Sequence, residues 1–104
     1  MYVTDYLNHR VQVFSQNGTF LRTFGSGPGK LSFPRGIHLD HDYVYVVEYG
    51  NNRVSVFYTS GEFITSFGRR GSGEGELSNP TGTTIDQDGF LYICDGENNR
   101  IRVF

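Results

Sequence analysis

The protein has 104 residues, a net charge of −2 and a pI near 5.8, so no overall positive field attracts it to nucleic acid or to an anionic membrane. No apolar run approaches the ~18 residues that span a bilayer, and the N-terminus lacks the basic and apolar regions of a signal peptide. The single cysteine, Cys94, excludes an internal disulfide framework. We predict a cytoplasmic protein in which Cys94, inside an apolar run, is a small core residue.

The chain repeats one stretch three times, at residues 1–14, 44–57 and 91–104. The copies read MYVTDYLNHRVQVF, VYVVEYGNNRVSVF and LYICDGENNRIRVF. Each has two short runs of β-branched and aromatic residues, which favour strands, around a polar hinge that is typical of a tight hairpin loop. An acid begins each hinge and Asn-x-Arg ends it, so we expect the acid and the Arg to face each other as a structural clamp. The expected pairs are Asp5 with Arg10, Glu48 with Arg53 and Asp95 with Arg100.

The segments between the copies also repeat. Asn17-Gly18 is a strong hairpin signal, and it precedes a third strand. A Gly-rich connection then ends in Pro, and a fourth strand follows it. No helical period is found, so we predict essentially no helix. The repeated segments are the third strand at residues 20–24 and 63–67, the connection at 26–34 and 72–80, and the fourth strand at 36–40 and 82–86.

Four strands in a repeat of 43 residues (position 1 to 44) and then 47 residues (position 44 to 91) are typical of β-propeller blades. We therefore predict an all-β fold of four-stranded antiparallel meanders, ten strands in a partial propeller of about two and a half blades. The chain is predicted to be one domain, residues 1–104, with a partial blade at 1–24, a full blade at 33–67 and a partial blade at 82–104. Such an arc exposes apolar faces and unpaired edges. We expect further blades, from a longer chain or from homo-oligomerisation, to close the ring.

The repeated motifs resemble those of NHL repeats over the whole chain. Phe-Gly, Gly-x-Gly-x-Leu, Pro-x-Gly, an Asp-rich turn, Tyr-Val, an acid, Asn-x-Arg and Val-Phe follow one another in this order, and Asn8-His9 is the dipeptide typical of the family. The resemblance implies a propeller that usually has six blades. Such propellers often form the C-terminal end of tripartite-motif (TRIM) proteins, where they select partners or substrates for ubiquitination. Other members are RNA-binding regulators, a secretory amidating lyase and sensor domains of bacterial kinases.

Function is expected where the copies differ, because a scaffold repeats from blade to blade and a binding site does not. Arg69-Arg70 is an insertion without counterpart in the first connection. With Lys30 and Arg35 it would make a local basic patch of the kind that RNA-binding members of the family use. Two glutamates close by in the sequence favour a solvated loop instead.

Three tyrosines and a histidine complete the candidate binding residues. We interpret Tyr6, Tyr49 and Tyr58 as exposed contacts for a protein partner, since tyrosine is enriched at interfaces. His38 lies in the strand expected nearest the propeller axis, and Thr84 replaces it in the next copy.

No pattern predicts a metal, a cofactor or a catalytic residue. The Asp40-x-Asp42 and Asp86-x-Asp88 turns lack the further ligands of a calcium loop, and aspartate favours turns through its own hydrogen bonds. The three histidines are not spaced with Ser, Cys or Asp as nucleophilic catalysis requires.

The leading prediction is a non-enzymatic protein–protein interaction module that resembles the substrate-recognition propeller of TRIM E3 ubiquitin ligases. Ligase activity, if any, would then reside in domains absent from this chain. An RNA-binding propeller face is one alternative, and an amidating-lyase-like enzyme fragment is the other. No membrane partner is expected.

Overall fold

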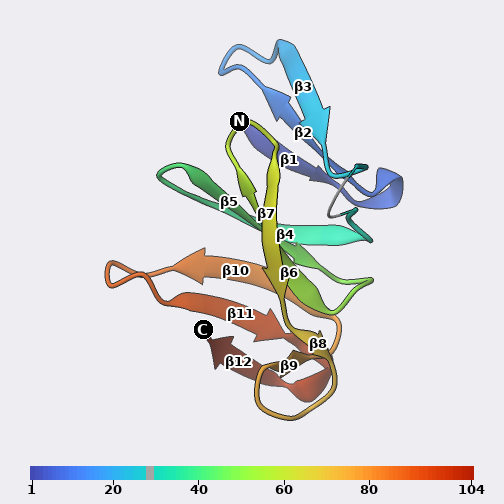
Figure 1. The fold of residues 1–104 in the computed structure, drawn as a ribbon, viewed down its shortest axis with the longest axis vertical. Coiled ribbons are helices and arrows are strands. Elements are labelled where there is room, and N and C mark those ends of the chain that lie inside the picture. Colours follow the sequence, from blue (N-terminus) through green and yellow to red (C-terminus); the bar gives the residue numbers. More distant parts are fainter. Residues whose placement is uncertain (28–29) are drawn as a thin grey trace.

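The computed structural model describes residues 1–27 and 30–104, and its regular secondary structure is almost wholly antiparallel strands. Residues 28–29, inside the predicted Gly-rich connection, lie outside the described residues. Figure 1 shows three sheets that follow one another along the long axis of the molecule, from blue to red. We call them blades 1, 2 and 3, and their strands pair in sequence order. Blade 1 comprises β1 (Tyr2–Asp5), β2 (Arg10–Phe14) and β3 (Phe20–Phe24); blade 2 comprises β4 (Pro34–Asp40), β5 (Tyr43–Glu48), β6 (Arg53–Tyr58) and β7 (Phe63–Phe67); blade 3 comprises β10 (Pro80–Ile85), β11 (Leu91–Asp95) and β12 (Arg100–Val103).

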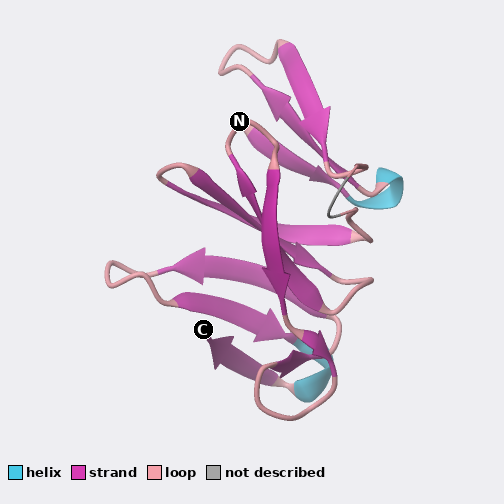
Figure 2. Ribbon diagram, viewed as in Figure 1, coloured by secondary structure: helices cyan, strands magenta, loops and turns pink. Residues whose placement is uncertain are grey.

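Two short 3-10 helices correct the prediction of an essentially helix-free chain. They are η1 (Tyr6–Asn8) and η2 (Gly96–Asn98), and Figure 2 shows both on the same side of the molecule, where hairpins turn. Each turn ends at a residue with a left-handed backbone: His9 in blade 1, with φ +54°, and Asn99 in blade 3, with φ +53°. One tight turn is too short to leave a helical period in the sequence, which explains the difference.

The Arg69-Arg70 insertion is a short strand, where the sequence suggested a solvated loop. β8 (Arg69–Arg70) pairs in parallel with β9 (Glu76–Leu77). These are the two described strands that the prediction of ten did not include. Arg69 lies opposite Glu76 in this pair. Two-residue strands carry no alternation that a sequence pattern can reveal.

The hydrophobic cores lie between blades. Strand β5 supplies both of them, because successive side chains of a strand point to opposite faces. Val44 and Val46 face blade 1, whereas Val47 faces blade 3, and all three are fully buried. The core between blades 1 and 2 consists of Val11, Val13, Phe24, Leu31, Val44, Val46 and Phe57, and the core between blades 2 and 3 consists of Val47, Val54, Leu77, Leu91 and Ile93.

The innermost strands of blades 2 and 3 approach each other backbone to backbone. A Cβ at Gly36 of β4 would lie 2.4 Å from the carbonyl oxygen of Thr81 and 3.0 Å from the Cα of Gly82, both in β10. Glycine is therefore required at position 36 by packing. The contact sets how closely the two blades meet where they converge.

The outer face of blade 3 corrects the prediction that Cys94 is a core residue. Cys94 is exposed, and it pairs in register with Ile101, which is 64% exposed. Its neighbours Ile93 and Asp95 point the other way and are buried. The apolar run indicated a strand but not which face Cys94 takes. No helix within the described residues has the length and apolar character to cross a membrane.

Candidate recognition face at the hairpin tips

An ion pair closes each of the three hairpins at its tip. The Arg Nε lies 2.9 Å from the carboxylate in Asp5–Arg10, 2.6 Å in Glu48–Arg53 and 2.8 Å in Asp95–Arg100. The first Asn of each hairpin donates its side-chain amide to the same acid. Hydrogen bonds from Arg10 and Asn8 hold the pKa of Asp5 below its ordinary value. The equivalent side chains Glu48 and Asp95 are fully buried.

The buried acids also bind the backbone that leads into their own blade. The N–H of Ser32 donates to Glu48 Oε1 at 3.0 Å, and the N–H of Ser78 donates to Asp95 Oδ1 at 2.7 Å. Burial disfavours the charge on Asp95, but the Ser78 N–H and two side-chain donors outweigh it and hold the pKa of Asp95 below its ordinary value. Each acid therefore joins the hairpin tip to the lead-in segment of the same blade.

In blades 1 and 2, the residue after the first Asn joins the blade to the next one, a role that the sequence did not reveal. The N–H of Phe33 donates to His9 Nδ1 at 2.9 Å, and the N–H of Asn79 donates to Asn52 Oδ1 at 2.8 Å. The acceptor lies at the tip of one blade and the donor in the segment that enters the following one. His9 of the Asn-His dipeptide and Asn52 of the Asn-Asn dipeptide share this function because the side chain of each carries an acceptor that reaches the next segment.

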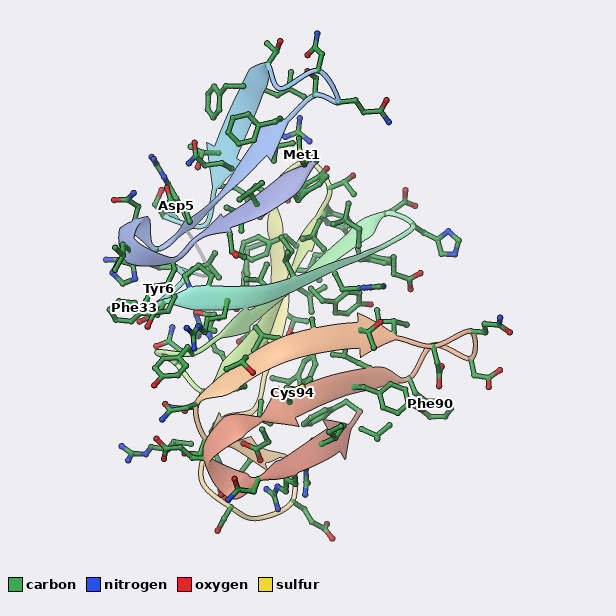
Figure 3. The ribbon with its side chains drawn as sticks, turned by 180° about the vertical axis from the view of Figure 1, so that it is seen from behind. Met1, Asp5, Tyr6, Phe33, Phe90 and Cys94 are labelled. Atoms are coloured by element: carbon green, nitrogen blue, oxygen red, sulfur yellow. The ribbon has the colours of Figure 1, made fainter. Side chains whose placement is uncertain are left out.

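Between the tips of blades 1 and 2 lies a group of aromatic rings around an arginine, which we call the tyrosine–arginine cluster: Tyr6, Phe33, Arg35 and Tyr49. The Arg35 guanidinium carbon is 5.1 Å from the ring centroids of both Tyr6 and Tyr49, so the cation lies against two π faces. The Tyr6 ring is 4.9 Å from Phe33 and 6.3 Å from Tyr49. Figure 3 shows Tyr6 and Phe33 together at one edge of the molecule, beside the hairpin that carries Asp5.

The cluster corrects the expectation that Tyr6 and Tyr49 are exposed. Both are half-buried, because each covers the other and Arg35, which itself is exposed. The backbone of Arg35 is held as well, since its carbonyl accepts a hydrogen bond from the Thr4 hydroxyl at 2.9 Å. The cluster is thus built by residues of two blades.

Phe33 holds an uncommon backbone conformation within the cluster. Its φ is +48°, in the left-handed region that a bulky residue rarely adopts, whereas Asn79 occupies the equivalent position in the next copy with φ +50°. Its N–H is donated to His9, and its carbonyl accepts from the Tyr49 N–H at 2.9 Å. Contacts on both sides therefore maintain the conformation, and it places the ring against Tyr6 and His9.

The predicted basic residues divide between two places. Arg69 pairs with Glu76 at 2.9 Å, and Arg35 lies in the tyrosine–arginine cluster. Lys30 and Arg70 are exposed, and neither forms an ion pair with a described residue. Lys30 lies in the connection that enters blade 2, and Arg70 in the connection that enters blade 3.

Two other predicted residues lie away from the cluster. Tyr58 is 43% exposed and its ring is 6.0 Å from Tyr43, at the end of the β5–β6 hairpin opposite the Glu48–Arg53 tip. His38 is half-buried on the innermost strand β4, opposite Tyr45.

In the second Asp-rich turn, the Asp86 carboxylate holds the turn itself. Asp86 accepts hydrogen bonds from the N–H groups of Phe90 and Asp88 and from the Tyr92 hydroxyl. The Phe90 N–H and the Tyr92 hydroxyl are the main groups that hold the pKa of Asp86 below its ordinary value. Within residues 1–27 and 30–104, no three His, Cys, Asp or Glu side chains are grouped to hold a metal ion.

Comparison with known proteins identifies the repeat. The family model of the NHL repeat matches residues 77–104. The matched residues include the whole of the last blade, β10 to β12. The match confirms, over these residues, the resemblance that the motifs carry. Within the repeat lie the Asp95–Arg100 clamp and the Ser78 N–H that binds it.

Two curated relatives share a stretch of this repeat protein. The mouse E3 ubiquitin-protein ligase TRIM71 is 49% identical over 37 residues, which are 36% of this chain and 4% of that protein. Protein lin-41 of Caenorhabditis elegans is 46% identical over 37 residues, which are 36% of this chain and 3% of that protein. The similarity therefore concerns a small part of each relative.

The whole chain is similar in structure to a solved propeller. The crystal structure of selenomethionine-substituted virginiamycin B lyase from Staphylococcus aureus matches 99% of this chain and 36% of its own, with a TM-score of 0.71 and 22% sequence identity. At that identity the likeness concerns the fold. The three sheets are β-propeller blades, as the repeat length predicted.

Proposed function

We propose that the chain is a non-enzymatic protein-recognition module, and that it binds its partner with the hairpin-tip face around the tyrosine–arginine cluster. The observation that carries this proposal is the position of Arg35 between the rings of Tyr6 and Tyr49, at 5.1 Å from each centroid. The cluster belongs to the part of the chain in which the blades differ. In blade 3, Gly96 replaces the tyrosine and Thr81 replaces the arginine.

The composition of the cluster is typical of residues that dominate binding energy at protein interfaces. Tyr and Arg are enriched among such residues, and a side chain that is already ordered loses less entropy on binding. Arg35 is ordered by its two rings, and Phe33 by the hydrogen bonds on both sides of its peptide unit. The exposed guanidinium of Arg35 remains available to donate hydrogen bonds to a carboxylate or carbonyl oxygen of a partner.

The named relatives support the same assignment. One of them, mouse TRIM71, is called an E3 ubiquitin-protein ligase, and the sequence of this chain has no pattern for catalysis. We propose that, in a longer protein of that kind, this face would select the protein to be ubiquitinated.

RNA binding is the second candidate. The exposed Arg70 favours it, but the adjacent Arg69 is held by Glu76, and Glu74 is exposed in the same connection. A net charge of −2 adds no long-range attraction for phosphates. The likeness to virginiamycin B lyase concerns the fold and adds no residue to a lyase mechanism.

The test is a selection of displayed random 12-residue peptides on the immobilised protein, followed by affinity measurement with Arg35→Glu and Arg70→Glu variants. Both variants change the net charge by the same amount, so Arg70→Glu is the matched control. We expect enriched peptides whose affinity falls at least tenfold with Arg35→Glu and stays within twofold with Arg70→Glu. A thermal unfolding scan of each variant checks that it folds.

Two results would overturn the proposal. One is the absence of any enriched peptide. The other is salt-dependent binding of a 20-nucleotide single-stranded RNA that Arg70→Glu weakens and Arg35→Glu does not, which would favour the RNA-binding face.

A further inference from the structure

The two interfaces between successive blades differ at equivalent positions. In the segment that leads into blade 3 and at the hairpin tip of that blade, the chain itself supplies acceptors for its polar side chains. Asn98 donates to the carbonyl of Gly71 at 2.9 Å, and the Ser78 hydroxyl donates to Glu97 Oε2 at 3.1 Å. Glu76 accepts from Arg69 and from the N–H of Gly73, both at 2.9 Å.

At the interface of blades 1 and 2, the residues that supply those acceptors are replaced. The insertion that contains Gly71 has no counterpart in the first connection. Gly50 stands at the position of Glu97, so no side chain reaches Ser32 as Glu97 reaches Ser78. Lys30 stands at the position of Glu76, which reverses the charge.

The donors at the interface of blades 1 and 2 remain around a pocket. It has a volume of about 340 Å³ and is lined by His9, Lys30, Leu31, Ser32 and Asn51. This volume is at the lower end of the range of ligand pockets, which begins near ~300 Å³.

Four of the lining residues offer hydrogen-bond donors. Asn51 gives one amide hydrogen to Glu48 Oε1 at 2.7 Å, and the other has no acceptor among the described residues. Because His9 accepts the Phe33 N–H at Nδ1, its neutral ring carries a proton on Nε2. Of the other lining residues, Lys30 carries an exposed ammonium side chain and Ser32 carries a hydroxyl.

Among the described residues, no carboxylate forms an ion pair with Lys30. Glu48, the clamp acid that the Ser32 N–H and the Asn51 amide bind, is fully buried. It accepts from the Ser32 N–H, Asn51, Arg53 and the Ser55 hydroxyl, so its oxygens are already occupied. The pocket therefore presents donors and one positive charge to a ligand.

We infer that this pocket binds a carboxylate of an acidic side chain in the partner protein. The equivalent position in blade 3 indicates the ligand class, because there the chain's own Glu97 carboxylate accepts the hydroxyl of Ser78, the counterpart of Ser32. The pocket adjoins the tyrosine–arginine cluster through His9, whose ring is 4.3 Å from Phe33. The inference rests on the proposed function and adds the chemistry of the partner: an acidic segment whose aspartate or glutamate enters the pocket while a neighbouring residue contacts Arg35.

The first test uses a small probe that does not depend on a known partner. The ¹⁵N-labelled protein is titrated with N-acetyl-glutamate amide and, in parallel, with N-acetyl-glutamine amide, which has the same shape without the charge. With the glutamate probe we expect saturable NMR shifts at the Asn51 side-chain amide and the Ser32 N–H. The affinity for the glutamine probe should be at least tenfold weaker. Equal shifts with both probes, or none at these groups, would overturn the inference.

The second test compares Lys30→Glu with Arg70→Glu, which change the net charge equally. Lys30→Glu introduces the residue found at position 76 and should lower the affinity for the glutamate probe at least tenfold. Arg70→Glu should leave that affinity within twofold of the value for the unmodified protein. Ser32→Ala, which removes one neutral donor and keeps the backbone bond to Glu48, should weaken the probe two- to fivefold. Loss of probe binding in Arg70→Glu to the same extent as in Lys30→Glu would mean that net charge, and not the pocket, attracts the carboxylate.

The peptides from the selection separate this inference from the proposed function. Support for both would come from peptides whose affinity falls at least tenfold when an acid is replaced by its amide. In the Lys30→Glu variant, the same replacement should cause no further loss of affinity. Peptides that require Arg35 but bind equally well without their acids, and bind Lys30→Glu as tightly, would overturn the carboxylate site and leave the recognition face standing. If no peptide is enriched but the glutamate probe binds, the proposed function fails while the pocket's preference for a carboxylate stands.

Discussion

The backbone N–H of Phe33 donates to the Nδ1 atom of His9 at 2.9 Å, and this bond joins the tip of blade 1 to the segment that enters blade 2. The next interface repeats it with Asn52 as the acceptor and Asn79 as the donor. A hydrogen bond of this kind leaves an unsatisfied N–H when its acceptor is removed, so the chain provides its own test of the link.

We predict that His9→Asn keeps the stability of the protein and that His9→Ala lowers it. Asn supplies an amide oxygen, as Asn52 does at the equivalent position, whereas Ala leaves the Phe33 N–H without its acceptor. The expected loss for His9→Ala is about 1 kcal/mol of unfolding free energy. Urea unfolding of both variants measures it, and an equal loss in His9→Asn would show that the imidazole ring packing matters more than the hydrogen bond.

We predict that Gly36→Ala destabilises the protein and that Gly82→Ala does not. A Cβ at Gly36 would lie 2.4 Å from the Thr81 carbonyl oxygen, so blades 2 and 3 would have to separate. At Gly82 the nearest atom is Cys94 Sγ at 3.7 Å, an ordinary contact. The expected cost is roughly 1–3 kcal/mol for Gly36→Ala, and it is absent for Gly82→Ala. Chemical denaturation tests this pair, and similar values for both would contradict the close approach of β4 and β10.

The buried clamp predicts how stability depends on pH. The pKa of Asp95 in the folded protein lies below its unfolded value, so its contribution is complete above the unfolded pKa, near ~3.9, and is lost as the pH falls through the folded value. Asp5 acts in the same direction. We expect unfolding free energy to decline below pH ~4. Urea titrations between pH 3 and 6 should show a shallower decline in Asp95→Asn, together with lower stability at pH 6; an unchanged slope would exclude Asp95 as a source of the acid sensitivity.

Phe33 should contribute to binding more than to stability. In Phe33→Asn the left-handed backbone is relieved of a bulky side chain, which offsets the lost contacts with Tyr6 and His9; each effect is on the order of 1 kcal/mol. We therefore expect a midpoint of thermal unfolding close to that of the unmodified protein, and a reduced affinity for the peptides that depend on Arg35. A variant that keeps full peptide affinity would show that the Phe33 ring takes no part in the recognition face.

Much of the fold was predictable because it depends on residues that are close together in the sequence. The alternation of apolar residues, the Asn-Gly turn and the repeat length depend on neighbours in the chain, and they predicted blades and their strand order. The register that sets Asp5 opposite Arg10 follows from hairpin geometry in the same way. What could not be predicted involves residues far apart. Cys94 was placed in the core because an apolar run does not tell which face of the end blade has a neighbour.

The candidate site shows the same division. Its residues Tyr6 and Tyr49 were singled out from the sequence, but as separate exposed side chains, and Arg35 was assigned to a basic patch with Arg69. In the structure Arg35 joins the two tyrosines and Arg69 joins Glu76. Phe33 and the second residue of the hairpin tip were missed. A signal existed in the alignment of the copies, where Phe33 replaces Asn79 at a position that takes positive φ.

The sequence by itself therefore determined the repeating blade, because hairpin pairing and side-chain alternation are decided within about forty residues of chain. Only the tertiary structure decided what lies between blades: which rings surround Arg35, which acceptor takes the Phe33 N–H, and which donors around Lys30 are left over. The physical reason is that these contacts join residues of adjacent blades. Their geometry is set by how closely the blades pack, and Gly36 against Thr81 shows how close that is.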